Sequence, residues 1–260
     1  MSQTAPAEEQ TLLTQFRHAV ADDLRTLAWL QSQELTQEVL ANLRQVDFPT
    51  NLGFRLQSPE SQNACEVMQQ AIAEFPQALN ETVIDDLAAD FAAIYLNSSL
   101  RTSPYESVWL SDDHLMRQKP MFQVREWYVK YDLQAKDWRN QPDDHLALQL
   151  EFIAHLLTLD DSEASLKASA DFLDEHLLRW ITQFASQVAN RCHTLFYASL
   201  TVLMAQYLEE LRDILAHILG QPRPSEAEIK ARMKQKAPVI EKEIEQEVEW
   251  QPEPGAPGWS

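Results

Sequence analysis

Glycine is nearly absent from this chain. The 260 residues contain four glycines, and two of them, Gly255 and Gly258, lie within the last six positions. β-Hairpins and phosphate-binding loops need glycine where the backbone takes a positive φ or must approach a ligand closely. The scarcity therefore argues against a hairpin-rich fold and against a glycine-rich phosphate loop, and it favours an all-α fold.

Cysteine, basic residues and long apolar runs are also scarce. The two cysteines, Cys65 and Cys192, are too few for a disulfide framework and form no metal-type pair. A net charge of −19 argues against nucleic acid and anionic membranes as partners. No apolar run reaches the roughly 20 residues of a membrane-spanning helix, so we expect no membrane insertion. The N-terminus does not have the pattern of a secretory signal peptide, and we expect a reduced, cytoplasmic protein.

Apolar residues make up 45% of the chain, which is enough for a large core. Their spacing of three and four residues predicts helices along most of the first 220 positions. The predicted helices cover residues 11–45, 61–75, 81–96, 121–131, 142–157, 165–187 and 192–219. The last of them ends before Gly220, a suitable C-terminal cap. We therefore predict a single multi-helix domain over residues 1–220.

Residues 221–260 differ in composition from the rest of the chain, since they hold six of the thirteen prolines. Ser225 and Glu228 form a capping-box pattern that predicts one short helix. The last twenty residues contain six acids and one lysine, which predicts a disordered, flexible acidic tail. Trp250 and Trp259 within it are either a docking motif or chance aromatics.

Acidic clusters offer one enzymatic alternative. Asp85, Asp86 and Asp90 have the spacing of the magnesium-binding acids in all-helical isoprenoid synthases, which use diphosphates. Such an enzyme needs a second acidic cluster and grouped basic residues, and the sequence shows neither. A solvated helix face is the simpler interpretation. The tripeptide Asp-Asp-His occurs at 112–114 and 143–145 without further ligands at a suitable spacing, so we predict no metal site.

The most informative motif is Pro142-Asp143-Asp144-His145, which runs directly into an apolar helix. Proline and aspartate suit the first turn of a helix, where N–H groups are unpaired and the dipole favours negative charge. The motif is therefore either a well-capped helix start or a functional site. Nine aromatic residues lie between Phe91 and Trp138. A groove lined by such rings and bordered by acids suits a basic peptide.

Three segments carry a resemblance to a known family. They are Asp90-Phe-Ala-Ala-Ile-Tyr-Leu96, Ser103-Pro-Tyr-Glu-Ser-Val-Trp-Leu-Ser111 and Pro142-Asp-Asp-His-Leu-Ala-Leu-Gln-Leu-Glu-Phe152. In this order and spacing they resemble the TorD/DmsD (NarJ-like) family of redox-enzyme maturation chaperones. The resemblance implies an all-helical cytoplasmic chaperone, not an enzyme. Such a chaperone binds the twin-arginine signal peptide and the apo form of a molybdopterin oxidoreductase, and it prevents premature export until the cofactor is inserted.

The resemblance also implies a binding site for the signal peptide. Its residues are Phe91, Tyr95, Pro104, Tyr105, Pro142, Asp144 and His145. We expect Asp144 to pair with a peptide arginine and His145 to titrate near neutrality beside it. The alternative is that Asp144 only caps its helix and that the other residues are structural.

Other properties follow from the same resemblance. It implies no cofactor, with weak guanine-nucleotide binding in some members, and it allows a monomer or a homodimer. Asn97-Ser98-Ser99 stands where many members have a glycine-proline turn. The chain has no adjacent arginine pair, so we do not expect it to be a twin-arginine export substrate itself.

Overall fold

The computed structural model describes residues 7–97, 102–136 and 141–235, and every regular element within these ranges is a helix. In chain order the elements are α1 (Ala7–Leu30), α2 (Gln37–Gln45), α3 (Pro59–Glu74), α4 (Glu81–Phe91), η1 (Ala92–Leu96), α5 (Glu106–Leu110), α6 (Lys119–Lys130), α7 (Leu146–Leu159), α8 (Glu163–Glu175), η2 (Leu177–Arg179), α9 (Ile181–Arg191), α10 (Leu195–Leu219) and α11 (Glu226–Gln235). The predicted all-α fold is confirmed. The predicted tail, with Trp250 and Trp259, lies outside the described residues.

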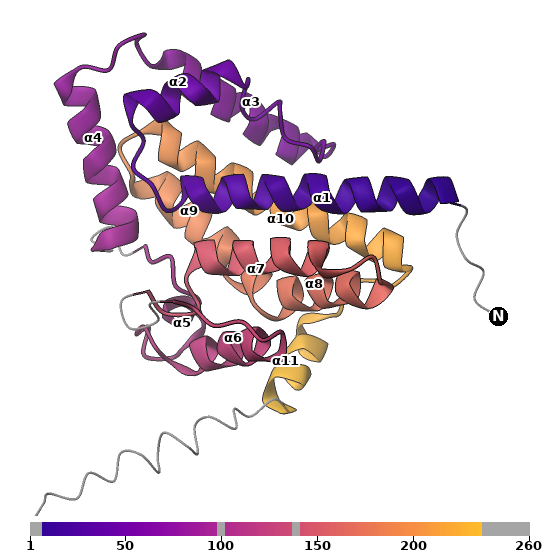
Figure 1. Cartoon of the computed structure of the whole chain (residues 1–260). Helices are drawn as coiled ribbons and strands as arrows, with labels where there is room; N and C mark the ends of the chain where they lie inside the picture. The colour runs from indigo at the N-terminus through magenta and orange to yellow at the C-terminus, as the bar shows by residue number, and fades with distance from the viewer. Residues whose placement is uncertain (1–6, 98–101, 137–140, 236–260) are drawn as a thin grey trace, which may run out of the picture.

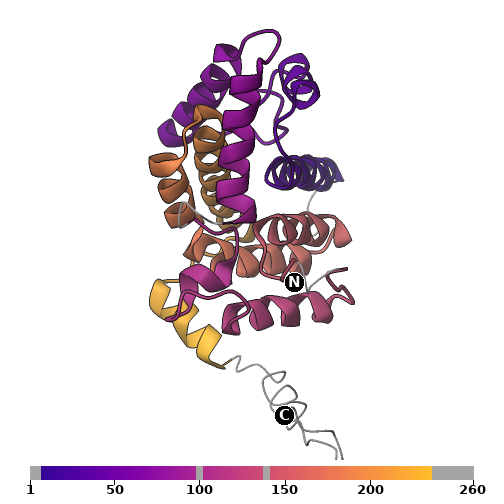
Figure 2. The same ribbon diagram turned by 90° about the vertical axis from the view of Figure 1, so that its left-hand side faces the viewer.

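The helices form two tiers (Figure 1 and Figure 2). One tier holds α1 to α4 with α9 and α10, and the other holds α5 to α8 with α11. α1 packs along α7, and α10 packs against α3, α8 and α9, so these contacts join the tiers. The largest buried rings come from α8 to α10 and include Phe172, Trp180 and Tyr197. None of the helices within the described ranges combines the length and apolarity needed to cross a membrane.

Local sequence signals fix several helix ends. Gly220 has φ +60° at the end of α10, and Gln221 donates to the Ala216 carbonyl in the manner of a Schellman cap. The capping box before α11 is also confirmed. Glu228 N–H donates to Ser225 Oγ at 3.3 Å, and Ser225 N–H donates to the Glu228 carboxylate at 2.7 Å.

Two predictions of long helices are wrong, and tertiary contacts explain both breaks. The predicted helix over 11–45 is divided by a turn between α1 and α2. Within that turn, Leu35 N–H donates to the buried hydroxyl of Tyr197 at 3.1 Å. The predicted helix over 165–187 is divided by η2. There, His176 turns its ring to Glu106 of α5, with Nδ1 and Oε1 2.9 Å apart.

Candidate functional site

Five of the seven residues implied by the resemblance meet where α5 and α7 begin. An antiparallel bridge pairs Tyr105 with His145, and their ring centroids lie 5.0 Å apart. Leu146 N–H donates to the Pro104 carbonyl at 2.7 Å, and His145 N–H donates to the Pro142 carbonyl at 3.1 Å. Two segments about 40 residues apart in sequence thus form one junction.

Phe91 and Tyr95 belong to the core of the other tier. Their rings contact each other and the ring of Tyr197 on α10. The Tyr95 hydroxyl donates to Gln31 at the end of α1. Both rings are buried, and their role in peptide binding stays a prediction.

His145 caps α7. The expectation that Pro142, Asp143 and Asp144 lie in the first helical turn is wrong, because α7 begins at Leu146 and these residues form the turn before it. His145 Nδ1 accepts a hydrogen bond from Ala147 N–H at 3.2 Å, which requires an unprotonated nitrogen. Burial lowers the pKa of His145 to about 4. The ring is therefore neutral at physiological pH, in contrast to the expected titration near neutrality.

Asp144 faces the interior, with none of its surface exposed. Its Oδ2 accepts a hydrogen bond from Ser107 N–H at 2.7 Å, and its backbone carbonyl accepts one from Glu106 N–H at 3.2 Å. Burial raises the pKa of Asp144 to about 6, although the hydrogen bonds from Ser107 oppose the increase. The carboxylate thus holds the start of α5 in place.

Glu106 extends this junction into a buried polar network. Its carboxylate accepts a hydrogen bond from Gln149 Nε2 at 3.1 Å and pairs with His176 Nδ1 at 2.9 Å. Glu106, Gln149 and His176 are all fully buried. Buried polar groups are costly unless they are hydrogen-bonded, so the network fixes α5, α7 and the end of α8 relative to one another.

Asp143 connects the turn to α6. Arg125 donates from Nε at 3.0 Å and from Nη2 at 2.7 Å to Asp143 Oδ2, and Tyr128 OH donates to the Asp143 carbonyl at 3.0 Å. The Asp143 side chain is almost fully buried and the Arg125 side chain is 20% exposed. A charge-assisted pair of this kind holds the guanidinium in a defined orientation.

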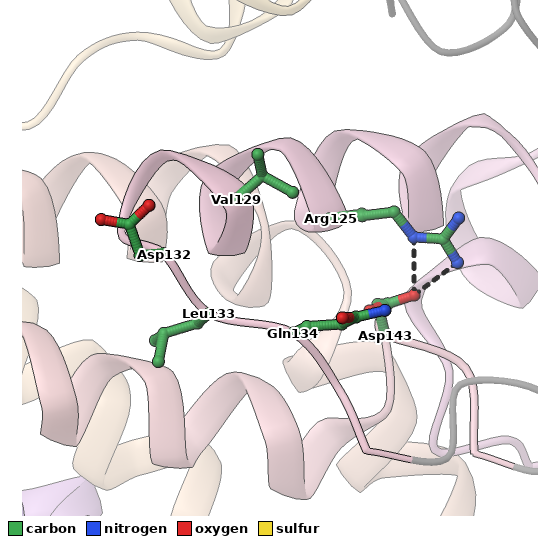
Figure 3. Close-up of a pocket in the computed structure, with 6 residues that line it drawn as sticks. All are labelled: Arg125, Val129, Asp132, Leu133, Gln134 and Asp143. Atoms are coloured by element: carbon green, nitrogen blue, oxygen red, sulfur yellow. Dashed lines mark hydrogen bonds and ion pairs between the residues drawn. The ribbon is translucent and has the colours of Figure 1, made fainter.

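The Arg125–Asp143 pair forms one wall of an open hollow of about 500 Å³ (Figure 3). Asp132 and Gln134 contribute exposed polar groups to it. Its remaining lining residues are Val129, which is 59% exposed, and Leu133. The hollow, called the α6 hollow below, therefore places the exposed carboxylate of Asp132 beside apolar groups, opposite a carboxylate that Arg125 already neutralises.

Sequence reasoning missed Arg125 and His176, and it gave no role to Glu106 or Gln149. The last two lie within the segments that carry the family resemblance, so their neighbours in sequence indicated the region. A single arginine within a helix carries no such signal, and His176 was assigned to the interior of a continuous helix. Only the packing of α5, α6, α7 and α8 brings these side chains to the turn of Pro142 to His145, which is called the signature turn below.

The acids of the magnesium alternative do not converge. Asp85 and Asp86 are exposed on α4, whereas Asp90 is buried. The Asp90 carboxylate accepts hydrogen bonds from His193 N–H at 3.0 Å and from Thr194 N–H at 2.6 Å, so it holds the two residues that precede α10. Within the described part of the chain, no group of three or more His, Cys, Asp or Glu side chains could hold a metal ion.

Comparisons with known proteins identify the family. A family model described as nitrate reductase delta subunit matches residues 61–186, which run from α3 into α9. The chaperone protein TorD of Aliivibrio fischeri is 30% identical over 205 residues, which cover 76% of this chain and 94% of that protein. The chain belongs to the TorD family of redox-enzyme maturation chaperones.

Two further TorD chaperones show similar coverage. That of Aliivibrio salmonicida is 28% identical over 192 residues, covering 70% of this chain and 88% of its own. That of Vibrio cholerae is 27% identical over 204 residues, covering 74% and 91%. Membership in the TorD family makes this protein a maturation chaperone for a molybdoenzyme, and it confirms the family resemblance of the signature segments.

Proposed function

We propose that this protein is a cytoplasmic chaperone that binds the twin-arginine signal peptide and the apo form of a molybdopterin oxidoreductase. It assists cofactor insertion and holds the client back from export until insertion is complete. The observation that carries the proposal is the match to 94% of the length of a TorD chaperone. This match supports a binding protein without catalytic activity. We further propose that it holds no cofactor of its own and that it binds guanine nucleotides weakly, as the family resemblance implies.

The α6 hollow supports recognition of a basic, partly apolar peptide. Asp132 and Asp143 lie on opposite sides of it, and Val129 and Leu133 provide apolar surface between α6 and the following loop. A peptide arginine would pair with the exposed carboxylate of Asp132, and the neighbouring apolar side chains of the peptide would pack on Val129. The net charge of −19 adds long-range attraction for a basic peptide.

The signature residues act in this proposal through the turn that they hold. His145 caps α7 and Asp144 binds Ser107 N–H, so both fix the turn that presents Asp143 to the hollow. Pro142, Pro104 and Tyr105 complete the junction on either side. Phe91 and Tyr95 would contact a peptide only if the core around Tyr197 opened.

Capture of a client precursor tests the proposal. The client is sought among molybdopterin oxidoreductases encoded beside this protein's gene, and it is expressed in cells that cannot make the cofactor. Tagged full-length chaperone is offered the native precursor, a precursor whose arginine pair is replaced by lysines, and one without its signal peptide. We expect strong capture of the native precursor alone. Equal capture of all three would contradict signal-peptide recognition.

A matched pair of variants tests the α6 hollow in the same assay. Asp132→Asn removes the exposed carboxylate of the hollow, and we expect capture to fall several-fold without a change in melting temperature. Asp86→Asn makes the same chemical change on an exposed position of α4. It should capture as much precursor as the unaltered chain. If both variants behave alike, the peptide does not use the α6 hollow.

A further inference from the structure

The last described helix, α11, lies at the edge of the lower tier (Figure 1 and Figure 2). Met233 is its buried side chain, with 6% of its surface exposed. Gln123 Nε2 of α6 donates to the Met233 carbonyl at 3.3 Å. Arg232 Nη1 pairs with Asp171 of α8 at 3.2 Å, and this pair is partly exposed. Exposed ion pairs contribute little to stability, so α11 is lightly attached.

Open hollows lie beside α11 instead of close packing. One of about 320 Å³ is lined by Met233 together with Trp127, Asp171 and His176. Another of about 360 Å³ lies between Ile229 of α11 and the end of α8. Part of the surface beside α11 is therefore left uncovered by it.

The first hollow contains an unused hydrogen-bonding group. His176 lines it, and Nε2 of its fully buried ring has no hydrogen-bond partner. The other ring nitrogen is committed to Glu106 at 2.9 Å. Buried polar atoms in native proteins are usually paired, so this nitrogen marks a place where a ligand atom can bind.

The residues of α11 show which ligand the surface accepts. Ile229 and Met233 are four residues apart and share one face of the helix. Lys230, Arg232 and Lys234 outnumber Glu226 and Glu228, so this helix is basic within a chain of net charge −19. It is thus a basic helix that carries two large apolar side chains on one face. Its Arg232 pairs with the carboxylate of Asp171, and its Met233 lines the hollow.

We propose that the surface beneath α11 is a docking site for a basic amphipathic segment of the client, and that α11 is its resident occupant. We call this surface the α11 seat and define it by Gln123, Trp127, Asp171 and His176. The identity of the partner rests on the proposed function. Residues of α6 line both the α6 hollow and the seat, so a signal peptide whose arginine pair lies in the hollow would place a flanking segment on the seat. Client binding displaces α11 from the seat. Because a linker of only five residues, 221–225, tethers α11 to α10, its effective concentration at the seat is high and it competes strongly with the client.

A labelled peptide with the sequence of residues 223–235 tests the α11 seat by fluorescence anisotropy. It is titrated into the full-length protein and into Met233→Glu, which loosens the resident helix by removing its buried side chain. We expect the variant to bind the peptide at least about ten-fold more tightly, because the tethered competitor is weakened. Ala231→Glu makes a like charge change at an exposed position and should bind as the unaltered chain does. Equal affinity for all three proteins, or no binding, would overturn the proposal.

Two additions make the outcome specific. Asp171→Asn in the Met233→Glu background should abolish the gain, since it removes the carboxylate that holds Arg232. Unlabelled signal peptide of the client should displace the labelled peptide; a signal peptide that binds but displaces nothing would overturn the partner assignment. A signal peptide that binds none of these proteins would contradict the proposed function alone, because the labelled peptide tests the seat without a client.

Discussion

The turn before α7 contains two titratable groups whose pKa values are shifted in opposite directions. Burial raises the pKa of Asp144 from 3.8 to about 6, against the opposing hydrogen bonds from Ser107. Burial lowers the pKa of His145 from 6.5 to about 4. Each shift amounts to about 2 pH units, or about 3 kcal/mol of free energy of unfolding. The two groups therefore give opposite dependences of stability on pH.

The signs follow from which state holds the proton. Between pH 4 and 6, folded Asp144 holds a proton that the unfolded chain has lost, so its contribution to stability falls as pH rises. Between about pH 4 and 6.5, His145 is protonated only in the unfolded chain, so its contribution rises with pH. Because the two contributions nearly cancel, they become visible only when one of the groups is replaced.

Two conservative substitutions separate them. His145→Asn retains a side-chain acceptor at the N-cap of α7 but removes the titrating ring. Relative to the unaltered chain, we expect its stability to fall by about 3 kcal/mol as pH rises from 4 to 6.5. Asp144→Asn retains an oxygen for Ser107 N–H, and its relative stability should rise by about 3 kcal/mol between pH 4 and 6.

Urea denaturation followed by circular dichroism at intervals of half a pH unit measures both profiles. Subtracting the profile of the unaltered chain removes the titration of all other groups. Parallel profiles for the two variants would refute the opposed assignment. A His145 ring that titrates near pH 6.5 by NMR would refute its burial and its capping role.

Three further substitutions test individual contacts. Arg125→Ala leaves Asp143 buried without its cation and should lower the free energy of unfolding by about 3–5 kcal/mol in urea denaturation. Arg25→Ala, which breaks an exposed pair, should cost less than about 1 kcal/mol. Equal losses would contradict the structural role of the Arg125–Asp143 pair. Asp90→Ala should cost about 1–3 kcal/mol in the same assay because it leaves the N–H groups of His193 and Thr194 without their acceptor, so an unchanged urea midpoint would count against these hydrogen bonds. Gly220→Ala should lower the melting temperature because φ is +60°, and Gly220→Asn should lower it less; equal melting temperatures for both would contradict this account.

Local patterns in the sequence were sufficient for much of the helical fold. Apolar spacing predicted the longer helices but not the short α5, and Gly220, Ser225 and Glu228 predicted helix ends because caps act over four or five residues. The two helix breaks were not predictable in this way. One depends on the hydroxyl of Tyr197 and the other on the carboxylate of Glu106, and both partners are distant in sequence.

The signature turn was located from the sequence, but the roles of its residues were not. A cap by His145 and a buried bond from Asp144 to Ser107 depend on the packing of α5 against α7. Arg125 gave no signal, because its partner Asp143 lies on another element. Charge and motif therefore indicated a basic-peptide chaperone, while the exposed acid Asp132 emerged only from the fold.

Calorimetric titration of the full-length chain with the client's twin-arginine signal peptide tests the central claim most directly. At low salt we predict saturable binding that is at least about ten-fold weaker when both arginines are replaced by lysines, since lysine cannot make a bidentate pair with a carboxylate. A parallel titration with magnesium and diphosphate tests the alternative based on Asp85, Asp86 and Asp90. No heat with the signal peptide, together with tight magnesium-dependent binding of diphosphate, would contradict the account.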